Sequence, residues 1–461
     1  MLMLLKKAWR RLRNFWRTNT PVKTPQFRPP KDEVVRRLLQ SSYFPNQRPS
    51  RDELPPVFRT SQISVKVARK LEAKIPKGKY GFDAIEYKLT RADGQIRASH
   101  IPHPAAYSAL VLAIDRYWEK LPDIFNNQAS FIKPRLHRDG RLIVMKYESW
   151  LTKTLRSLQW KMTARYVVHA DITNFFSSIY THSLGWAVAG IQEAKSSNGS
   201  RWYDKLDKAF RFTKRNETNG VLVGPATSNI AAELVLFSID KKLSESGYRF
   251  YRHIDDYKCY CDTQEKAEQF IADLTRYLSD FKLTLNAGKT KIQALPLPDA
   301  EPWVDELRVA ARALKGRPSA AMVQSYLDLA ARLAAKFNEP NAYKYAVTVL
   351  VKKRLNSKAK LACFTKVIGY AQFVPNLIPL LHHFLPSQQE CIENQIGETI
   401  VSRLNESARF ARSDEMSWLI YLSYKVKQEI PIELAEKILN RRDCIATVML
   451  FATCIKMLEL E

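Results

Sequence analysis

The sequence has few cysteines, and their spacing does not fit a disulfide framework or a zinc site. The six cysteines lie at positions 259, 261, 363, 391, 444 and 454, and no two of them form a CxxC pair. This spacing excludes a small disulfide-stapled secreted domain, and no further Cys or His pair completes a zinc site with Cys259 and Cys261. We therefore expect reduced thiols and a cytoplasmic protein.

Long apolar runs are missing as well. No apolar run reaches the roughly 20 residues that a transmembrane helix needs, so we expect no transmembrane segment. The first residues, MLMLLKKAWRRLRNFWR, do not fit a signal peptide, because their apolar stretch is short and is followed at once by charges.

Acidic residues are absent from the N-terminus, where no Asp or Glu precedes Asp32. Apolar residues recur there at helical spacing among Lys and Arg: Leu5, Trp9, Leu12 and Trp16. Three interpretations stay open: an arm that contacts nucleic acid, a helix on a membrane surface, and a helix docked on its own domain or on a neighbouring subunit. We favour docking combined with nucleic-acid contact. Residues 20–31 are Pro-rich, so residues 1–35 are predicted to be a basic arm and linker.

Positive charge is abundant. Lys and Arg outnumber Asp and Glu by 73 to 46, which gives a net charge of +27. Residues 301–461 carry only about +5 of it, so most of the excess lies in the first 300 residues. An excess of this size and placement indicates a polyanionic partner such as nucleic acid, because neutralised phosphates release counterions.

The chain is long enough for two or three domains, and up to residue 298 its pattern is mixed. A strand, a turn at Asp93-Gly94 and a second strand precede a helix. The remaining predicted elements are a strand over 165–172, polar helices over 187–218, a helix over 226–243, a hairpin over 248–262, a helix over 263–281 and strand-like residues over 282–295.

From residue 299 onward the pattern is helical only. The predicted helices cover 304–314, 320–337, 341–355, 398–411, 416–426 and 431–442. No strict repeat is visible. Stacked helical pairs, as in a HEAT-like array, would give this pattern, and so would a compact helical bundle.

Three aspartates carry the chemistry that the sequence suggests. Asp255 and Asp256 stand together at the turn of the predicted hairpin, and Asp171 ends the strand over 165–172. Nucleotidyl transfer uses two cations about 4 Å apart, held by carboxylates and substrate phosphates. An Asp-Asp pair alone is usually turn chemistry. The joint pattern instead predicts that Asp171 and Asp255 bridge two Mg²⁺ ions, with Asp256 in support.

With the segments around these acids, the chain resembles a reverse transcriptase. The matching segments, in order, are GQIRASHIPHPAAYSAL, ADITNFFSSIYTHSL, GVLVGPATSNIAAEL, YRHIDDY and LTLNAGKTKI, within about residues 80–295. The resemblance implies an α+β right-hand polymerase core, an antiparallel sheet plus helices, followed by an all-α HEAT-like domain. Its parts would be fingers over 36–165, palm over 166–298 with a fingers-like helical insert at about 187–218, and a thumb-replacing domain over 299–461.

The resemblance also implies roles for single residues. Phe176 falls where the family places a bulky aromatic under the sugar, which selects deoxynucleotides, and Lys289 matches a catalytic lysine near the triphosphate. Gly224 and Pro225 would let the backbone approach the nucleotide. The other residues expected to contact the nucleotide are Ile172, Phe175, Arg97 and Lys88.

Two positions depart from the family pattern, and some enzymatic domains are missing. His253 stands where Tyr is common, and Leu222-Val223 replaces a common Pro-Gln, which puts ordinary template reading in question. No ribonuclease H pattern and no integrase-like or HNH-like Cys/His cluster follows the palm. This argues against a retroviral enzyme or a complete group II intron protein.

A polymerase core followed by helices alone is similar to the bacterial abortive-infection and defence-associated reverse transcriptases. The resemblance implies antiphage defence, an RNA template, deoxynucleotide substrates and a DNA product. In some members it implies a partner non-coding RNA or synthesis that begins on a protein hydroxyl, and others are homo-oligomers. Two alternatives stay open: a retron- or intron-derived enzyme that copies its own RNA, and a non-polymerising RNA-binding protein. The sequence does not identify the template, primer, product, phage trigger or role of the helical tail.

Overall fold

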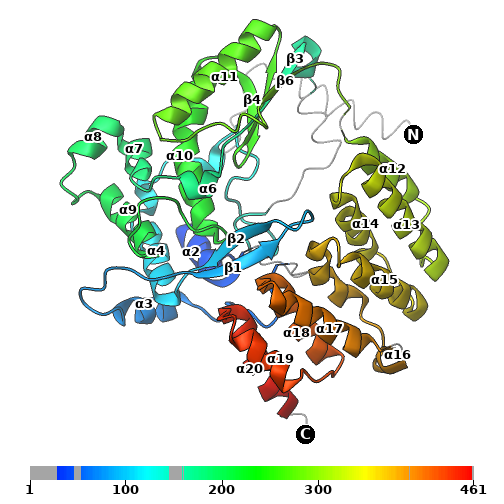
Figure 1. Ribbon diagram of the computed structural model, residues 1–461. Coiled ribbons are helices and arrows are strands. Elements are labelled where there is room, and N and C mark those ends of the chain that lie inside the picture. The colour runs from blue at the N-terminus through cyan, green and yellow to red at the C-terminus, as the bar shows by residue number, and fades with distance from the viewer. Residues whose placement is uncertain are drawn as a thin grey trace, which may run out of the picture.

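The computed structural model describes residues 28–45, 53–144, 158, 160–298, 300–393 and 395–458. The predicted basic helix at the N-terminus lies outside these residues. Figure 1 shows a mixed α/β part, which contains two sheets, and a series of helices that continues to the C-terminus.

A four-stranded antiparallel sheet carries two of the three aspartates. Its order is β4 (Arg249–His253), β5 (Asp256–Cys261), β3 (Tyr166–Asp171) and β6 (Lys291–Ala294), which confirms the strand over 165–172 and the hairpin over 248–262. Helix α11 (Gln264–Ser279) packs on β3 and β5, and α10 (Ala226–Glu245) packs on α11. Because side chains alternate along a strand, Val168 and Cys259 enter this core, whereas Asp171 lies on the opposite face.

A second, two-stranded sheet is the hairpin of β1 (Ile85–Thr90) and β2 (Ile96–Ile101), as predicted. Around it lie α2 (Lys31–Ser41), α3 (Val65–Ala73), α4 (Pro104–Arg116), η1 (Trp118–Lys120) and η2 (Ile124–Asn126). Helix α2 begins before the predicted end of the N-terminal arm and linker. Its buried Val34, Val35, Leu38 and Leu39 belong to one hydrophobic core that continues into the four-stranded sheet, so the predicted fingers and palm share a core.

Four short helices connect β3 to α10. They are α6 (Phe175–Ser178), α7 (Ser183–Ala189), α8 (Ile191–Ser196) and α9 (Trp202–Phe212), and α9 packs on α4 and α7. The polar helices predicted over 187–218 are therefore present. They lie against the first part of the chain, at one edge of the view in Figure 1.

The strand predicted over 282–295 is only partly correct, because β6 covers just its last residues. The preceding stretch is a loop that returns to the end of β3. Thr173 donates its backbone N–H to Thr284 O (2.9 Å), and Asn286 donates to Asp171 O (2.7 Å). The apolar pattern of residues 283–285 (LTL) is thus explained by burial beside β3. It does not indicate a continuous strand.

The C-terminal part forms a separate hydrophobic core of helices. It contains α12 (Pro302–Ala310), α13 (Ala320–Phe337), α14 (Asn341–Val351), α15 (Ser357–Tyr370), η3 (Pro375–Phe384), α16 (Gln388–Glu393), α17 (Ile396–Arg409), α18 (Ser413–Lys425), α19 (Ile432–Leu439) and α20 (Cys444–Leu458). The six predicted helices are confirmed, and α15, η3, α16 and α20 are additional. None of the helices in the described ranges combines the length and apolarity that crossing a membrane requires.

The helical part returns to the first part of the chain at the β1–β2 hairpin, where α18 packs on β1 (Figure 1). The carboxylate of Asp414 accepts hydrogen bonds from Thr90, from its N–H at 2.6 Å and from its hydroxyl at 2.8 Å. Tyr87 Oη lies 3.0 Å from Ser417 Oγ. All four residues are buried, so the hairpin is held by the helical part.

Candidate active site

The three aspartates predicted as metal ligands lie together at the edge of the four-stranded sheet. Asp171 and Asp256 are direct cross-strand partners on β3 and β5, and Asp255 is in the turn just before β5. The carboxyls of Asp171 and Asp256 interact, since Asp171 contributes to the raised pKa of Asp256. Lys289 Nζ lies 3.2 Å from Asp171 Oδ2, so the predicted catalytic lysine also belongs to this group.

The carboxyls of Asp255 and Asp256 resist ionisation. Burial, with repulsion from Asp171, raises the pKa of Asp255 to about 6, although Arg97 and Lys289 oppose the shift. Loss of hydration, the hydrogen bond with Asp171 and repulsion from Asp255 raise the pKa of Asp256 above its ordinary value. The site therefore has more negative charge than its neighbouring Lys and Arg side chains neutralise. Bound cations would supply the missing positive charge.

The turn that carries Asp255 has an unusual backbone. Ile254 has φ +58°, in the left-handed region that β-branched residues rarely adopt. Its carbonyl accepts a hydrogen bond from Arg252 Nη1 at 2.9 Å. Such outliers persist only where the surroundings hold them, and they are frequent at functional sites.

Arg252 is held by a buried ionic network beneath this turn. Its guanidinium donates to both carboxylate oxygens of Glu233 (2.7 and 2.9 Å) and to Asp240 Oδ2 (2.8 Å). Arg252, Glu233 and Asp240 are at most 2% exposed. Sequence reasoning missed this network. Its signal was an Arg in a buried strand just before the Asp pair, with Glu233 and Asp240 on the buried side of the preceding helix α10.

A cavity of about 290 Å³ lies beside the turn, between the β1–β2 hairpin and the start of α10. Phe176, Gly224 and Arg97 line it, as the sequence predicted for nucleotide-contacting residues, together with Asn229 and Ile254. A Cβ on Gly224 would lie 2.7 Å from Ser99 Oγ and 2.8 Å from Pro45 Cγ, and its φ is +126°. Only glycine fits where this loop meets the hairpin.

The loop before Gly224 is fastened to β2. Val223 O accepts hydrogen bonds from His100 N (2.7 Å) and Ser99 Oγ (3.1 Å). Val223 therefore contributes backbone contacts with the hairpin in the position where the family commonly has Gln. It also lines the cavity.

The other predicted nucleotide contacts lie elsewhere. Phe175 is 2% exposed and belongs to the core, and so does Ile172 at 1%. Pro225 is buried and immediately precedes α10. Lys88 pairs with Ala98 on the face of the hairpin opposite to Arg97, because side chains alternate between faces. The cavity is therefore lined by Arg97, Phe176 and Gly224. Its lining does not include Ile172, Phe175, Pro225 or Lys88.

The donor set fits hard divalent cations, which take carboxylate oxygens. In the part of the chain that the structure describes, no group of three His, Cys, Asp or Glu side chains has the close arrangement of a metal-ligand cluster. The carboxyl of Asp171 forms an ion pair with Lys289.

Comparison with known proteins gives a family match in the same region of the chain. Residues 107–325 match the sequence family described as "Reverse transcriptase (RNA-dependent DNA polymerase)", just under half of the chain. The match contains all three aspartates, Phe176, Gly224 and Lys289. It begins after the β1–β2 hairpin and ends in α13, later at both ends than the segment on which we based the resemblance. No curated protein matches the chain at a significant level.

Solved structures give weaker similarity. An apo telomerase from Candida tropicalis, truncated from its C-terminal domain, is 12% identical with a TM-score of 0.31 over 49% of this chain and 52% of its own. The apo telomerase from the same organism is 12% identical with a TM-score of 0.34, over 75% of this chain and 70% of its own. These scores add nothing to the family match.

Proposed function

We propose that the chain is an RNA-directed DNA polymerase that acts in bacterial antiphage defence, because residues 107–325 match a reverse transcriptase domain. It would add deoxynucleotides to a DNA product on a non-coding RNA template, or begin that product on a protein hydroxyl. The observation that carries the polymerase part is the meeting of Asp171, Asp255 and Lys289 at one sheet edge. The defence part is supported only by the combination of this core with a purely helical tail.

Two Mg²⁺ ions are proposed as cofactors, held by Asp171, Asp255 and Asp256. When bound, they would supply charge neutralisation for the attacking and leaving oxygens. The raised pKa of Asp255 supports this proposal, because a buried carboxyl short of positive charge gains most from a cation. Lys289 would neutralise or protonate the departing pyrophosphate.

The cavity beside the turn is the proposed deoxynucleotide site. Phe176 would block a 2′-hydroxyl there, and Arg97 would contact the phosphates. Arg97 is supported by its position in the lining of this cavity and by its charge, which opposes the rise in the pKa of Asp255. Lys88 remains a prediction from the sequence and has no such support.

The helical tail is proposed to take the place of a thumb, as a HEAT-like array or a compact bundle. A cavity of about 680 Å³ between the hairpin and the tail supports this role, because it shares Arg97 with the nucleotide cavity. Its lining has both signs of charge, with Arg91 and Lys344 beside Asp93 and Glu339. We further propose a cytoplasmic protein, consistent with the free cysteines of the described residues. A homo-oligomer is a candidate assembly.

The proposal is tested by purifying the protein from its cells with whatever nucleic acid it binds. The comparison is with an Asp255→Ala/Asp256→Ala double variant, and both samples are sequenced. We expect one specific RNA in both samples and complementary DNA only with the wild type. RNA without DNA, even when deoxynucleotides and Mg²⁺ are added, would favour the non-polymerising RNA-binding protein. DNA that copies the enzyme's own transcript would favour the retron- or intron-derived alternative.

The defence role needs its own test. Cells carrying the wild-type gene are challenged with a panel of phages beside cells that carry the double variant. We expect fewer plaques only with the wild type. Equal plaque counts, with active enzyme confirmed in the same cells, would contradict antiphage defence without affecting the polymerase assignment.

A further inference from the structure

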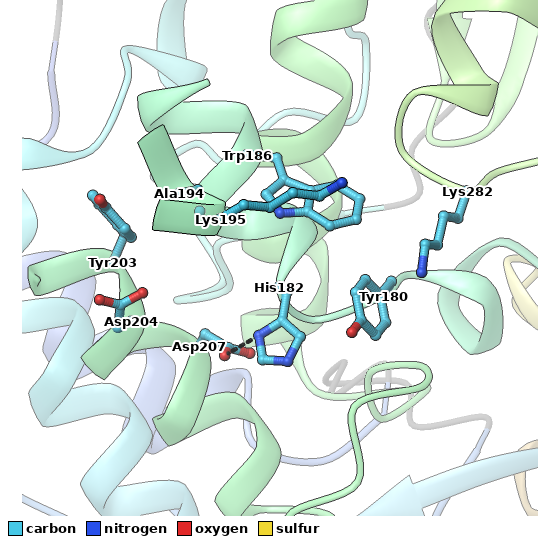
Figure 2. Close-up of a pocket in the computed structure, with 10 residues that line it drawn as sticks. Tyr180, His182, Trp186, Ala194, Lys195, Tyr203, Asp204, Asp207 and Lys282 are labelled. Carbon is cyan, nitrogen blue, oxygen red and sulfur yellow. Dashed lines mark ion pairs between the residues drawn. The ribbon is translucent and has the colours of Figure 1, made fainter. Parts of the chain in front are cut away.

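A second cavity, of about 270 Å³, lies outside the catalytic site among α7, α8, α9 and the loop that follows α11 (Figure 2). Tyr180 and Trp186 form an aromatic wall, with ring centroids 5.5 Å apart. Its volume is close to the ~300 Å³ of the smallest ligand sites in proteins. Nothing in the assigned chemistry uses this cavity.

Two lysines stand over this aromatic wall. Lys282 Nζ lies 4.2 Å from the centroid of the Tyr180 ring, and Lys195 Nζ lies 5.6 Å from that of Trp186. Lys282 Nζ also lies 5.8 Å from the centroid of the Trp186 ring, and Figure 2 shows Lys195 beside Trp186 and Lys282 near Tyr180. Exposed cation–π contacts are weak compared with the stacking of a base on an aromatic ring. A nucleic-acid base could therefore take the place of the ammonium groups over the rings. The lysine side chains would then point toward the phosphate of the bound nucleotide.

The floor of the cavity has unsatisfied polar atoms. Tyr203 Oη and Asp207 Oδ1 have no hydrogen-bond partner among the described residues, although both residues are only 4% exposed. The other oxygen of this carboxylate is occupied, since Asp207 Oδ2 lies 2.7 Å from His182 Nδ1, the contact drawn in Figure 2. Buried polar atoms normally have partners, and because these two atoms are closed off from solvent, a ligand would reach them only after neighbouring side chains shift.

The cavity is connected to the catalytic site through two short segments. Tyr180 follows α6, the helix that carries Phe176, and Val221 N donates to Phe176 O at 2.8 Å. Lys282 begins the loop whose other end holds Lys289 beside Asp171. A strand running from the catalytic site across this surface would meet the aromatic wall.

We propose that this cavity binds one nucleotide of a single-stranded nucleic acid, with its base against Tyr180 and Trp186 and its phosphate beside Lys195 and Lys282. Single-stranded nucleic acid is bound by this combination of stacking rings and cations. The inference rests on the proposed function only in taking the strand to be the enzyme's RNA or its DNA product. It adds a binding site that lies outside the nucleotide-addition site.

The test measures binding of a single-stranded RNA of about 12 nucleotides, without Mg²⁺ or deoxynucleotides, so that polymerisation is not required. Lys195→Gln/Lys282→Gln is compared with Lys205→Gln/Lys208→Gln, which removes the same charge from exposed positions of α9 outside the cavity. The two lysines share one phosphate in the proposed site, so their removal should reduce the slope of log K against log salt by about 0.7. The control pair should leave the slope unchanged. Equal slopes for the two pairs would overturn the proposal.

A second measurement locates the base. RNA that contains 4-thiouridine is crosslinked, and the modified peptide is identified by mass spectrometry. We expect a crosslink to the segment with Tyr180 and Trp186, and Tyr180→Leu should weaken RNA binding about tenfold. Crosslinks confined to other segments would overturn the proposal. So would binding of a free mononucleotide at this cavity without binding of the strand.

Discussion

At the scale of single residues, the position of Asp255 depends on a residue that performs no chemistry. Arg252 lies beneath the turn, and its guanidinium connects Glu233 and Asp240 in α10 to the carbonyl of Ile254. The left-handed backbone of Ile254 costs free energy, on the order of 1–3 kcal/mol. We infer that the buried network offsets this cost and so fixes the carboxyl that follows.

Arg252→Met should therefore destabilise the protein strongly. Removal of the cation leaves two buried carboxylates uncompensated, for which we expect a loss of about 3–5 kcal/mol in the free energy of unfolding. Urea denaturation measures this change. Arg249→Met, in the same strand but exposed, is the control and should stay within about 0.5 kcal/mol of the wild type. Similar stabilities for the two variants would refute the role of the network.

Phe176→Ala tests the selection of the sugar. If the ring blocks the 2′-hydroxyl, the variant should raise ribonucleotide relative to deoxynucleotide incorporation by about tenfold or more, ~1.4 kcal/mol in the barrier difference. Primer extension with each nucleotide type gives the ratio. Phe373→Ala, at a position that is 80% exposed in the helical part, is the control. An unchanged ratio in Phe176→Ala would mean that another group selects the sugar.

At this scale the sequence predicted the residues that carry motifs and missed those that support them. Asp171, Asp255, Asp256 and Lys289 meet as expected because strand ends and a hairpin turn place them. The resemblance gave the sugar contact to Phe176 and also expected Phe175 to contact the nucleotide, but the short helix α6 places the Phe175 ring in the core. Arg252 was missed because its pairing with Glu233 and Asp240 depends on side-chain contacts with the preceding helix α10, which the sequence pattern does not show.

At the scale of elements, the attachment of α18 to β1 gives the helical tail a structural role. Asp414 accepts two hydrogen bonds from Thr90, and β1 pairs with β2, the strand that carries Arg97. The sequence predicted the hairpin and the helices but not the packing between them. Long-range packing of this kind leaves no periodic pattern. The short extent of β6 was missed for a similar reason, because burial beside β3 resembles a strand.

Asp414 should make stability depend on pH. Burial raises the pKa of this carboxyl to about 6 from its ordinary 3.8. The Asp414 carboxyl binds its proton more tightly in the folded protein than in the unfolded protein. Protonation therefore stabilises the folded protein below about pH 4, and this contribution is lost as the pH rises from about 4 to 6. Two pKa units correspond to about 3 kcal/mol. Asp414→Asn should remove this part of the dependence.

Chemical denaturation at pH 4.5, 6 and 7.5 measures the difference between the two proteins. Ser417→Ala, which changes a neighbouring hydrogen bond without a titrating group, is the control and should keep the dependence of the wild type. If the curves of wild type and Asp414→Asn run parallel over this range, the carboxyl does not titrate as proposed.

At the scale of the whole molecule, two hydrophobic cores are joined at the hairpin, and the positive charge is concentrated in the first 300 residues. The basic N-terminus contributes to this charge. Deletion of residues 1–18 should flatten the salt dependence of RNA binding, by about 0.7 in slope for each phosphate that these residues neutralise in the full chain. Binding titrations in a salt series measure it. An unchanged slope would assign the N-terminus to docking or assembly.

Extension of a labelled primer on an RNA template, with deoxynucleotides and Mg²⁺, measures the proposed catalysis itself. The wild type is compared with Asp255→Asn and with Asp262→Asn, an exposed acid at the other end of β5. We expect DNA synthesis by the wild type and by Asp262→Asn, and a rate about 10³-fold lower for Asp255→Asn, equivalent to ~4 kcal/mol in the barrier. Equal rates for wild type and Asp255→Asn would contradict the assignment of this carboxyl to catalysis.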